Sequence, residues 1–128
     1  MPGRILAIGD IHGTDVALEV VLSRIGLSRD DTVVVLGDVV DRGPGTRRAI
    51  DILLKVQQYC QLILIQGNHE EMMLDALAGG EWSPGWLRYG GDATLASYEG
   101  DPKKIPEQHL DLLRSSVDYW ETDTDIFI

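Results

Sequence analysis

Three short segments of this sequence carry side chains whose types and spacing suit metal-ion and proton-transfer chemistry. In each of them, a glycine is followed at once by Asp or Asn. The segments are Gly9-Asp10-Ile11-His12-Gly13, Gly37-Asp38-Val39-Val40-Asp41-Arg42-Gly43 and Gly67-Asn68-His69-Glu70. Carboxylate oxygens, amide oxygens and imidazole nitrogens bind divalent metal ions in proteins. One such residue alone indicates only a turn, a helix cap or a structural histidine, whereas the threefold repetition favours a joint metal site.

The predicted ligands divide between two metal ions. Asp10 and His12 are two residues apart, so in an extended segment their side chains point to the same side and can bind one ion. Asp38 can bridge that ion to a second one, to which Asn68 offers its amide oxygen. A pair of divalent ions activates a water and holds the attacking and leaving oxygens of a phosphoryl transfer. The pattern therefore predicts phosphoryl chemistry.

Other residues of these segments suit the remaining steps of that chemistry. His69 lies beside the predicted site and can donate a proton to the leaving oxygen. Asp41 can hold the ring of His69 in the productive tautomer. Arg42 has a planar, permanently charged guanidinium that suits phosphate oxygens. We therefore expect Arg42 and Asn68 to contact the substrate.

Each polar segment follows a run of residues with strong strand propensity, at 4–8, 32–36 and 62–66. Apolar residues recur at helical spacing in the intervening stretches, 14–25 and 46–60. This alternation predicts an α/β fold with a parallel βαβαβ core, right-handed crossovers and a buried first strand. The carboxyl ends of the strands then meet at one edge of the sheet, where ligands bind in open α/β folds.

The second part of the chain reads as shorter helices followed by a hairpin. The expected helices are 70–78, 92–98 and one from Pro106 that carries Leu110, Leu113 and Val117 on one face. Residues 119–128 read as strand, turn, strand.

Several single residues have two plausible roles. Trp82, Trp86 and Tyr89 could line a cleft or form a small core under a loop, and we favour the small core. His109 falls on the polar side of its helical pattern, so we expect it on the surface. Cys60 is expected to be a small buried hydrophobe rather than a nucleophile.

The composition is that of one globular domain, which we assign to residues 1–128. The chain has 128 residues, 44% of them hydrophobic, which is enough for a single core. Its net charge of -10 argues against a nucleic-acid footprint. One cysteine excludes an intrachain disulfide, and no segment has the roughly 18 apolar residues of a membrane span. Without a signal peptide pattern, the expected location is the cytoplasm.

The three glycine-containing segments resemble the N-terminal signatures of the calcineurin-like metallophosphoesterases. The stretch from Trp86 to Tyr98, with its Gly90-Gly91, is similar to bacterial members of the phosphoprotein phosphatase branch. That branch includes bacterial and phage Ser/Thr phosphatases and symmetrical dinucleoside tetraphosphatases. The resemblance extends over essentially the whole chain.

The resemblance implies a role for each matching residue. The residues implied to bind the first ion are Asp10, His12 and Asp38. The residues implied to bind the second ion are Asp38 and Asn68. His69 would be the general acid, with Asp41 as its partner, and Arg42 a phosphate clamp. The family usually holds manganese, iron or zinc.

The sequence departs from the family at its C-terminal end. Family members continue past the strand that ends here at Ile128, and they add further histidine ligands and more strands. We therefore expect only the parallel core of the family's sandwich, without its C-terminal half, and partial or weak metal occupancy. The hairpin at 119–128 should then leave apolar strand edges exposed, and we expect self-association through it.

Two classes of function follow from these observations. The first is a metal-dependent phosphoesterase acting on a phosphorylated protein or small phosphoester, most simply phospho-Ser/Thr, with dinucleoside polyphosphate as the alternative substrate. The second is a phosphatase-like binding module without turnover.

Overall fold

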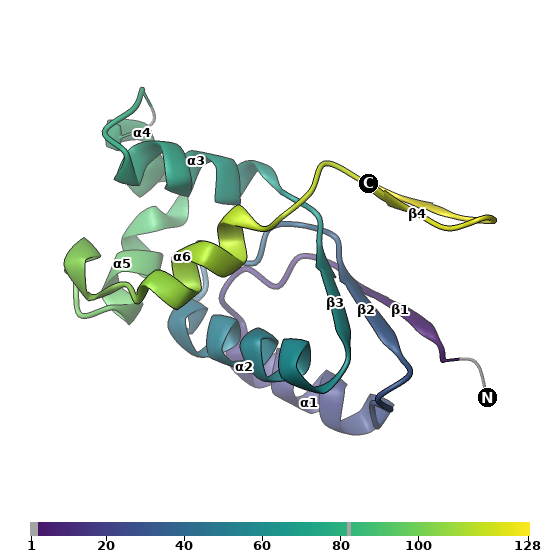
Figure 1. Ribbon diagram of the computed structural model, residues 1–128. Coiled ribbons are helices and arrows are strands. Elements are labelled where there is room, and N and C mark those ends of the chain that lie inside the picture. Colours follow the sequence, from purple (N-terminus) through teal and green to yellow (C-terminus); the bar gives the residue numbers. More distant parts are fainter. Residues whose placement is uncertain (1–2, 82) are drawn as a thin grey trace.

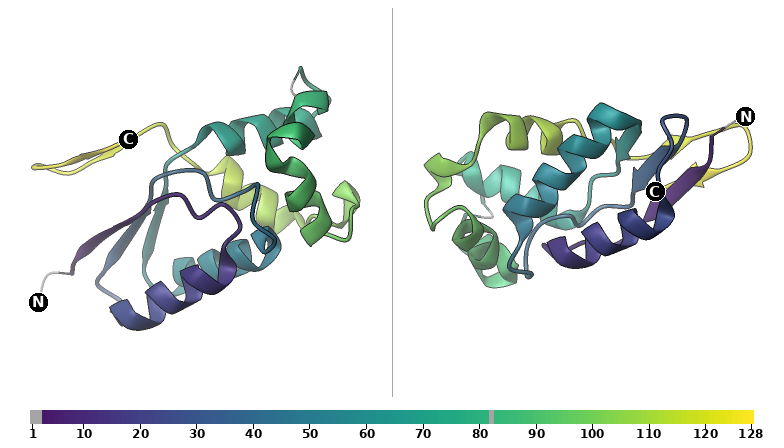
Figure 2. Two further views of the ribbon diagram at one scale, coloured as in Figure 1. Left: turned by 180° about the vertical axis from the view of Figure 1, so that it is seen from behind. Right: turned by 90° about the horizontal axis from the view of Figure 1, so that it is seen from below.

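The computed structural model describes residues 3–81 and 83–128 and contains a three-stranded parallel sheet (Figure 1). The strands are β1 (Ile5–Ile8), β2 (Thr32–Val35) and β3 (Gln61–Leu64), in the order β1-β2-β3. Helices α1 (Asp15–Ile25) and α2 (Thr46–Tyr59) connect the strands and lie on one face of the sheet (Figure 2). The predicted parallel βαβαβ core is confirmed.

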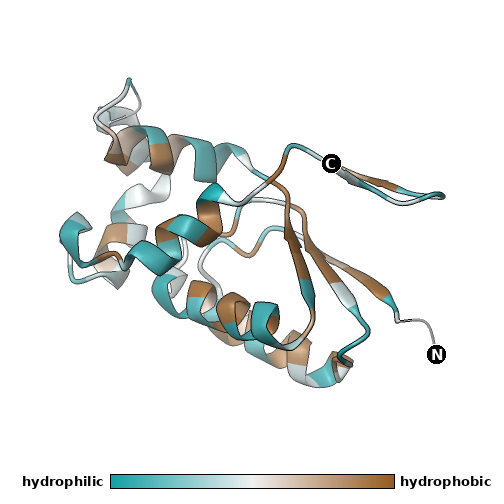
Figure 3. Cartoon of the chain, in the orientation of Figure 1, coloured by the Kyte–Doolittle hydropathy of each residue, from teal (hydrophilic) through white to brown (hydrophobic). Residues whose placement is uncertain are grey.

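The face of the sheet that the two helices cover is the centre of the hydrophobic core. Val33 and Val35 of β2 are fully buried, as are Ala49 and Leu53 of α2. Figure 3 shows hydrophobic residues along all three strands. The expectation that the first strand is buried is wrong, because β1 is an edge strand and only one face of the sheet carries helices. Ile5, on the other face, is 43% exposed.

The second part of the chain packs mainly as short helices beside α2 and past the end of β3 (Figure 1). In chain order they are α3 (Asn68–Leu77), α4 (Ser83–Trp86), the π-helical segment η1 (Leu87–Gly91), α5 (Asp92–Ser97), the 3-10 helix η2 (Pro102–Lys104) and α6 (Glu107–Arg114). Within η1, Tyr89 and Gly90 have non-helical dihedral angles, so the chain kinks between α4 and α5.

Helix α6 ends at Arg114, so Val117 does not belong to its apolar face as expected. The hydroxyls of Ser115 and Ser116 donate to carbonyls one turn back, a local bond that competes with further helix. The chain then extends beside β3, where Val117 forms an isolated parallel bridge with Ile65.

The C-terminal residues form the expected hairpin of β4 (Trp120–Glu121) and β5 (Ile126–Phe127). It projects away from the helical body in both Figures 1 and 2. The Trp120 and Phe127 rings pack 5.6 Å apart, and Ile128 is 81% exposed. Self-association through this hairpin stays a prediction.

His109 is buried, which corrects its expected surface position. Only 2% of it is exposed, because the polar side of α6 meets α2 and Tyr98 instead of solvent. Cys60 is half-buried against the core, and burial raises the pKa of its thiol, as suits a packing role. Within residues 3–81 and 83–128, no helix is long and apolar enough to cross a membrane.

Candidate active site

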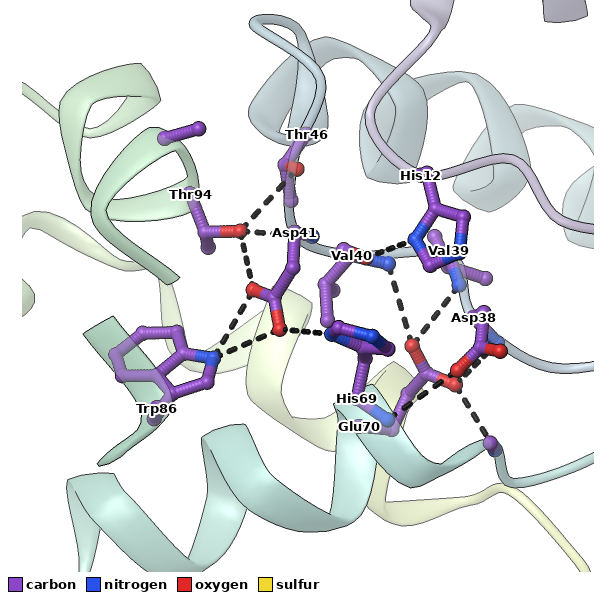
Figure 4. Close-up of polar contacts among 12 residues, drawn as sticks. His12, Asp38, Val39, Val40, Asp41, Thr46, His69, Glu70, Trp86 and Thr94 are labelled. Atoms are coloured by element: carbon purple, nitrogen blue, oxygen red, sulfur yellow. Dashed lines mark hydrogen bonds and ion pairs between the residues drawn. The ribbon is translucent and has the colours of Figure 1, made fainter. Parts of the chain in front are cut away.

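The loops that follow β1 and β2 bring three of the predicted metal ligands together. Ligand atoms of Asp10, His12 and Asp38 all lie within 4.8 Å of one another. The Nδ1 atom of His12 lies 3.0 Å from the carbonyl oxygen of Val40 (Figure 4). Because a carbonyl only accepts hydrogen bonds, Nδ1 carries the proton and Nε2 is the nitrogen available to an ion. Two carboxylates and one oriented imidazole form a donor set that fits a divalent transition metal.

The backbone of these loops is strained at the same residues. Non-glycine residues rarely adopt positive φ angles, which cost free energy and cluster at functional sites. The described residues with this conformation are Asp10 (φ 47°), His12 (43°), Asp38 (53°), Asp41 (74°), Arg42 (74°) and Glu99 (62°). Five of these six are candidate site residues, and the strain therefore marks this edge of the sheet independently of residue type.

Gly67 permits the close approach of the third loop to the second. A Cβ atom at this position would lie 2.4 Å from both the backbone nitrogen and the Oδ1 atom of Asp38. Any larger residue would therefore displace the carboxylate of Asp38. This contact explains why the third polar segment begins with glycine.

Glu70 fixes the backbone of the Asp38 loop. Its buried carboxylate accepts hydrogen bonds from the N–H groups of Asp38 (2.7 Å), Val39 (2.9 Å), Val40 (3.2 Å) and Gly67 (2.9 Å). Burial raises the pKa of Glu70, and the hydrogen bonds from the backbone oppose that rise. The sequence reasoning assigned no role in the site to Glu70. Its place three residues after Gly67, as in a capping box, was the signal that could have identified it.

His69 lies beside the metal cluster and is paired with Asp41. Its Nδ1 atom is 2.8 Å from Oδ2 of Asp41, and both side chains are buried. Its ring meets that of His12 edge-on, with the centroids 4.9 Å apart. Its backbone N–H donates to Oδ1 of Asp38 at 3.2 Å. The structure thus joins the predicted general acid, its carboxylate partner and the metal cluster in one network.

Two residues that the sequence did not assign to the site hold Asp41 in place. The indole Nε1 of Trp86 lies 2.9 and 3.0 Å from the two carboxylate oxygens, and the Thr94 hydroxyl donates to Oδ1 at 2.7 Å (Figure 4). The same hydroxyl accepts from the N–H of Asp41 at 2.9 Å. Burial raises the pKa of Asp41, and the hydrogen bonds from Thr94, His69 and Trp86 oppose this effect. Trp86 packs in the core, as the sequence analysis favoured. Because its indole N–H is also buried, it needs a hydrogen-bond partner, and Asp41 is that partner.

Arg42 and Asn68 lie at the same edge but are exposed. The N–H of Arg42 donates to the carbonyl of Gly90 at 3.0 Å, which ties its loop to the kink in η1. Asn68 is the first residue of α3, next to His69. No described residue forms a hydrogen bond or an ion pair with the guanidinium of Arg42.

A pocket of about 380 Å³ opens directly beside His69. The residues that line it are Asn68, His69, Glu71, Met72 and Tyr89. Tyr89 thus lines a cleft, the role the sequence analysis held open but did not favour. Trp82 lies outside the described residues. Together, the cluster, the His69–Asp41 pair and the pocket bring candidate metal ligands, a candidate proton donor and space for an organic group to one edge of the sheet.

Comparison with known proteins gives consistent matches. The family model for calcineurin-like phosphoesterases matches residues 3–127. Serine/threonine-protein phosphatase 1 of Salmonella typhimurium is 35% identical over 89 residues, which cover 66% of this chain and 38% of that protein. The symmetrical bis(5'-nucleosyl)-tetraphosphatase of Neisseria meningitidis is 35% identical over 79 residues, which cover 61% of this chain and 28% of that protein.

A solved structure extends the match to three dimensions. The metallophosphoesterase from Sphaerobacter thermophilus has a TM-score of 0.58 and 30% sequence identity over 95% of this chain and 44% of its own. The present chain therefore spans less than half the length of each of these relatives.

Proposed function

This chain belongs to the calcineurin-like phosphoesterase family, and on that basis we propose that it hydrolyses phosphomonoesters with the help of divalent metal ions. The observation that carries this proposal is the cluster of Asp10, His12 and Asp38 beside the buried His69–Asp41 pair. Relatives named as phosphatases support it. We treat residues 1–128 as one domain within this activity.

The residues proposed to hold the ions are those predicted from the sequence. Asp10, His12 and Asp38 would hold one ion, and Asp38 and Asn68 a second. Manganese, iron and zinc all suit oxygen and imidazole donors. Such ions, when bound, neutralise charge on the phosphoryl oxygens and supply an activated water.

His69 would protonate the leaving oxygen. As an imidazolium it donates from Nδ1 to Asp41 and presents Nε2–H to the substrate. As the water oxygen bonds to phosphorus and gives up one proton to solvent, the bond from phosphorus to the leaving oxygen breaks and the Nε2 proton passes to the leaving oxygen. Neutral His69 then keeps its Nδ1–H on Asp41, so the carboxylate holds one tautomer throughout.

Arg42 is proposed to bind the phosphoryl group. Its exposed guanidinium lies on the loop between the metal cluster and Gly90, and a planar fork suits two phosphate oxygens. Asn68, beside His69, is proposed as a second substrate contact.

The favoured substrate is a protein phosphorylated on Ser or Thr, as the names of two bacterial relatives suggest. A dinucleoside polyphosphate is the alternative, which rests on the similarity to symmetrical tetraphosphatases. We further propose a cytoplasmic location and self-association through the hairpin at 119–128.

The decisive experiment is hydrolysis of a chromogenic phosphomonoester with and without Mn²⁺, combined with metal-binding measurements. Asp38→Ala should abolish both metal binding and turnover, whereas His69→Ala should reduce turnover and keep the metal. Asp123→Ala, which removes an exposed carboxylate in the hairpin, is the matched control and should change neither. Equal loss of metal in the Asp38 and His69 variants would contradict these roles. Metal binding without turnover would favour the phosphatase-like binding module.

A further inference from the structure

The pocket beside His69 has a chemical character of its own. Its lining includes Tyr89, which is 55% exposed, and the half-buried Met72. An aromatic face and a thioether favour flat, apolar groups. The cavity of about 380 Å³ is within the range of roughly 300–1,000 Å³ that small-molecule sites occupy.

The charge of the lining disfavours a second phosphate. Among the lining residues that the structure describes, none is Lys or Arg, and Glu71 contributes an exposed carboxylate. A further phosphate group in this pocket would therefore meet a like charge on the lining itself. An uncharged organic group meets no such penalty.

The position of the pocket identifies which part of a substrate it faces. His69 belongs both to the lining and to the network with Asp41 and Asp38. Since His69 is the proposed proton donor to the leaving oxygen, a group in the pocket is attached to that oxygen.

Backbone contacts fix the position of Tyr89 relative to the loop that carries Arg42. Gly90 has a φ of 107°, and a Cβ atom there would lie 2.7 Å from the backbone nitrogen of Arg42. The Gly90 carbonyl accepts the hydrogen bond from that nitrogen. The kink that presents Tyr89 is therefore fixed against Arg42, the proposed phosphate clamp.

We propose that this pocket is a leaving-group subsite that selects aryl phosphates, with Tyr89 and Met72 contacting the ring. The inference rests on the proposed hydrolysis of phosphomonoesters, and it departs from the phospho-Ser/Thr substrate that the names of the relatives favour, because the alkyl side chains of Ser and Thr have no ring to contact Tyr89 and Met72. The shared chemistry is a phosphate ester of a phenol, either a free aryl phosphate or a phosphotyrosine side chain.

The test is binding of stable phosphonates to the full chain in the presence of Zn²⁺. Benzylphosphonate should bind about tenfold more tightly than methylphosphonate, the gain expected from one aromatic contact and its burial. Methylenediphosphonate should show no such gain. In Tyr89→Ala the benzyl advantage should disappear while methylphosphonate affinity stays the same. Tyr119→Ala, which removes another exposed tyrosine, is the control.

A second variant tests the charge argument. Glu71→Lys should raise the affinity for methylenediphosphonate and leave that for methylphosphonate nearly unchanged. A peptide carrying phosphonomethylphenylalanine separates the two sources of the aryl group. Tighter binding than benzylphosphonate supports a protein substrate, and equal binding supports a free aryl phosphate.

The outcomes separate this inference from the proposed function. Equal binding of benzyl- and methylphosphonate, or a benzyl advantage that survives Tyr89→Ala, would overturn the aryl subsite alone. If neither phosphonate binds and Zn²⁺ binds equally to the wild type and Asp38→Ala, the proposed function and the subsite both fail.

Discussion

His69 and His109 are both buried and both hydrogen-bond to a carboxylate. They differ in whether the second ring nitrogen also has a hydrogen-bond partner among the described residues. In His109, Nδ1 lies 2.7 Å from the Tyr98 hydroxyl and Nε2 lies 2.7 Å from Asp51. In His69, Nδ1 lies 2.8 Å from Asp41, while Nε2 has no hydrogen-bond partner among the described residues. A histidine with both nitrogens satisfied by the protein stabilises the fold, whereas one that opens onto a cleft can move a proton.

The two carboxylates differ in the same sense. Asp41 is fully buried and is held by Trp86 and Thr94 as well as by His69. The side chain of Asp51 is 54% exposed, and solvent screens its contact with His109. Burial and the additional donors thus hold the Asp41 carboxylate in one position beside His69. The Asp51 carboxylate, by contrast, contacts the buried His109 from the protein surface.

The largest expected effect separates the two histidines by turnover. His69→Gln should lower kcat by roughly 100- to 10,000-fold, the range for loss of a general acid. His109→Gln should leave kcat nearly unchanged, because His109 lies outside the proposed site. Steady-state kinetics on a chromogenic phosphomonoester at saturating Mn²⁺ measures both. A comparable fall in the two variants would remove the distinction between them.

The next effect separates them by stability. His109→Ala removes two hydrogen bonds, leaves the buried Tyr98 hydroxyl without its partner and opens a cavity. We expect the free energy of unfolding to fall by about 2–4 kcal/mol. Urea denaturation measures this, and the double variant with Tyr98→Phe should recover part of the loss. A His109→Ala protein as stable as the wild type would show that the network is not structural.

A smaller effect tests the donors to Asp41. Trp86→Phe removes the indole N–H that contacts both carboxylate oxygens of Asp41, and we expect a roughly tenfold lower kcat/KM. The bonds from Trp86, Thr94 and His69 lower the pKa of Asp41 against the rise caused by burial. Removing one raises that pKa, so the carboxylate is protonated at higher pH and the acid limb of the pH–rate profile moves upward. A lower rate with an unmoved acid limb would assign Trp86 a packing role only.

The smallest effect concerns Asp51. Because its carboxylate is exposed, Asp51→Asn should change the free energy of unfolding by less than about 1 kcal/mol and leave kcat unchanged. Thermal and urea unfolding check the first value. A loss as large as that of His109→Ala would show that the contact with Asp51, rather than the contact with Tyr98, dominates this network.

The sequence predicted the parallel core and the place of the site because both depend on local patterns. Three β-rich runs, each followed by a polar loop, define the strands and bring Asp10, Asp38 and Asn68 to one edge. Helical periodicity placed α2, whose stripe through Ala49 and Leu53 is buried.

The features that the sequence did not predict depend on contacts between residues far apart in the chain or on where a helix ends. Trp86 and Thr94 reach Asp41 from 45 and 53 positions away, and no local pattern marks them. His109 was misplaced because a polar helix face can meet polar side chains of a neighbouring helix instead of water. Val117 was misplaced because two serines end α6 before it.

The most direct test of the account is a Zn²⁺ titration followed by NMR of the imidazole nitrogens, since the chain has only 3 histidines. We predict a large shift of Nε2 of His12 with Nδ1 remaining protonated, a smaller change at His69, and none at His109. Asp38→Ala should abolish the shift at His12. A zinc-induced shift at His109, or an unperturbed His12 at saturating zinc, would contradict the proposed site.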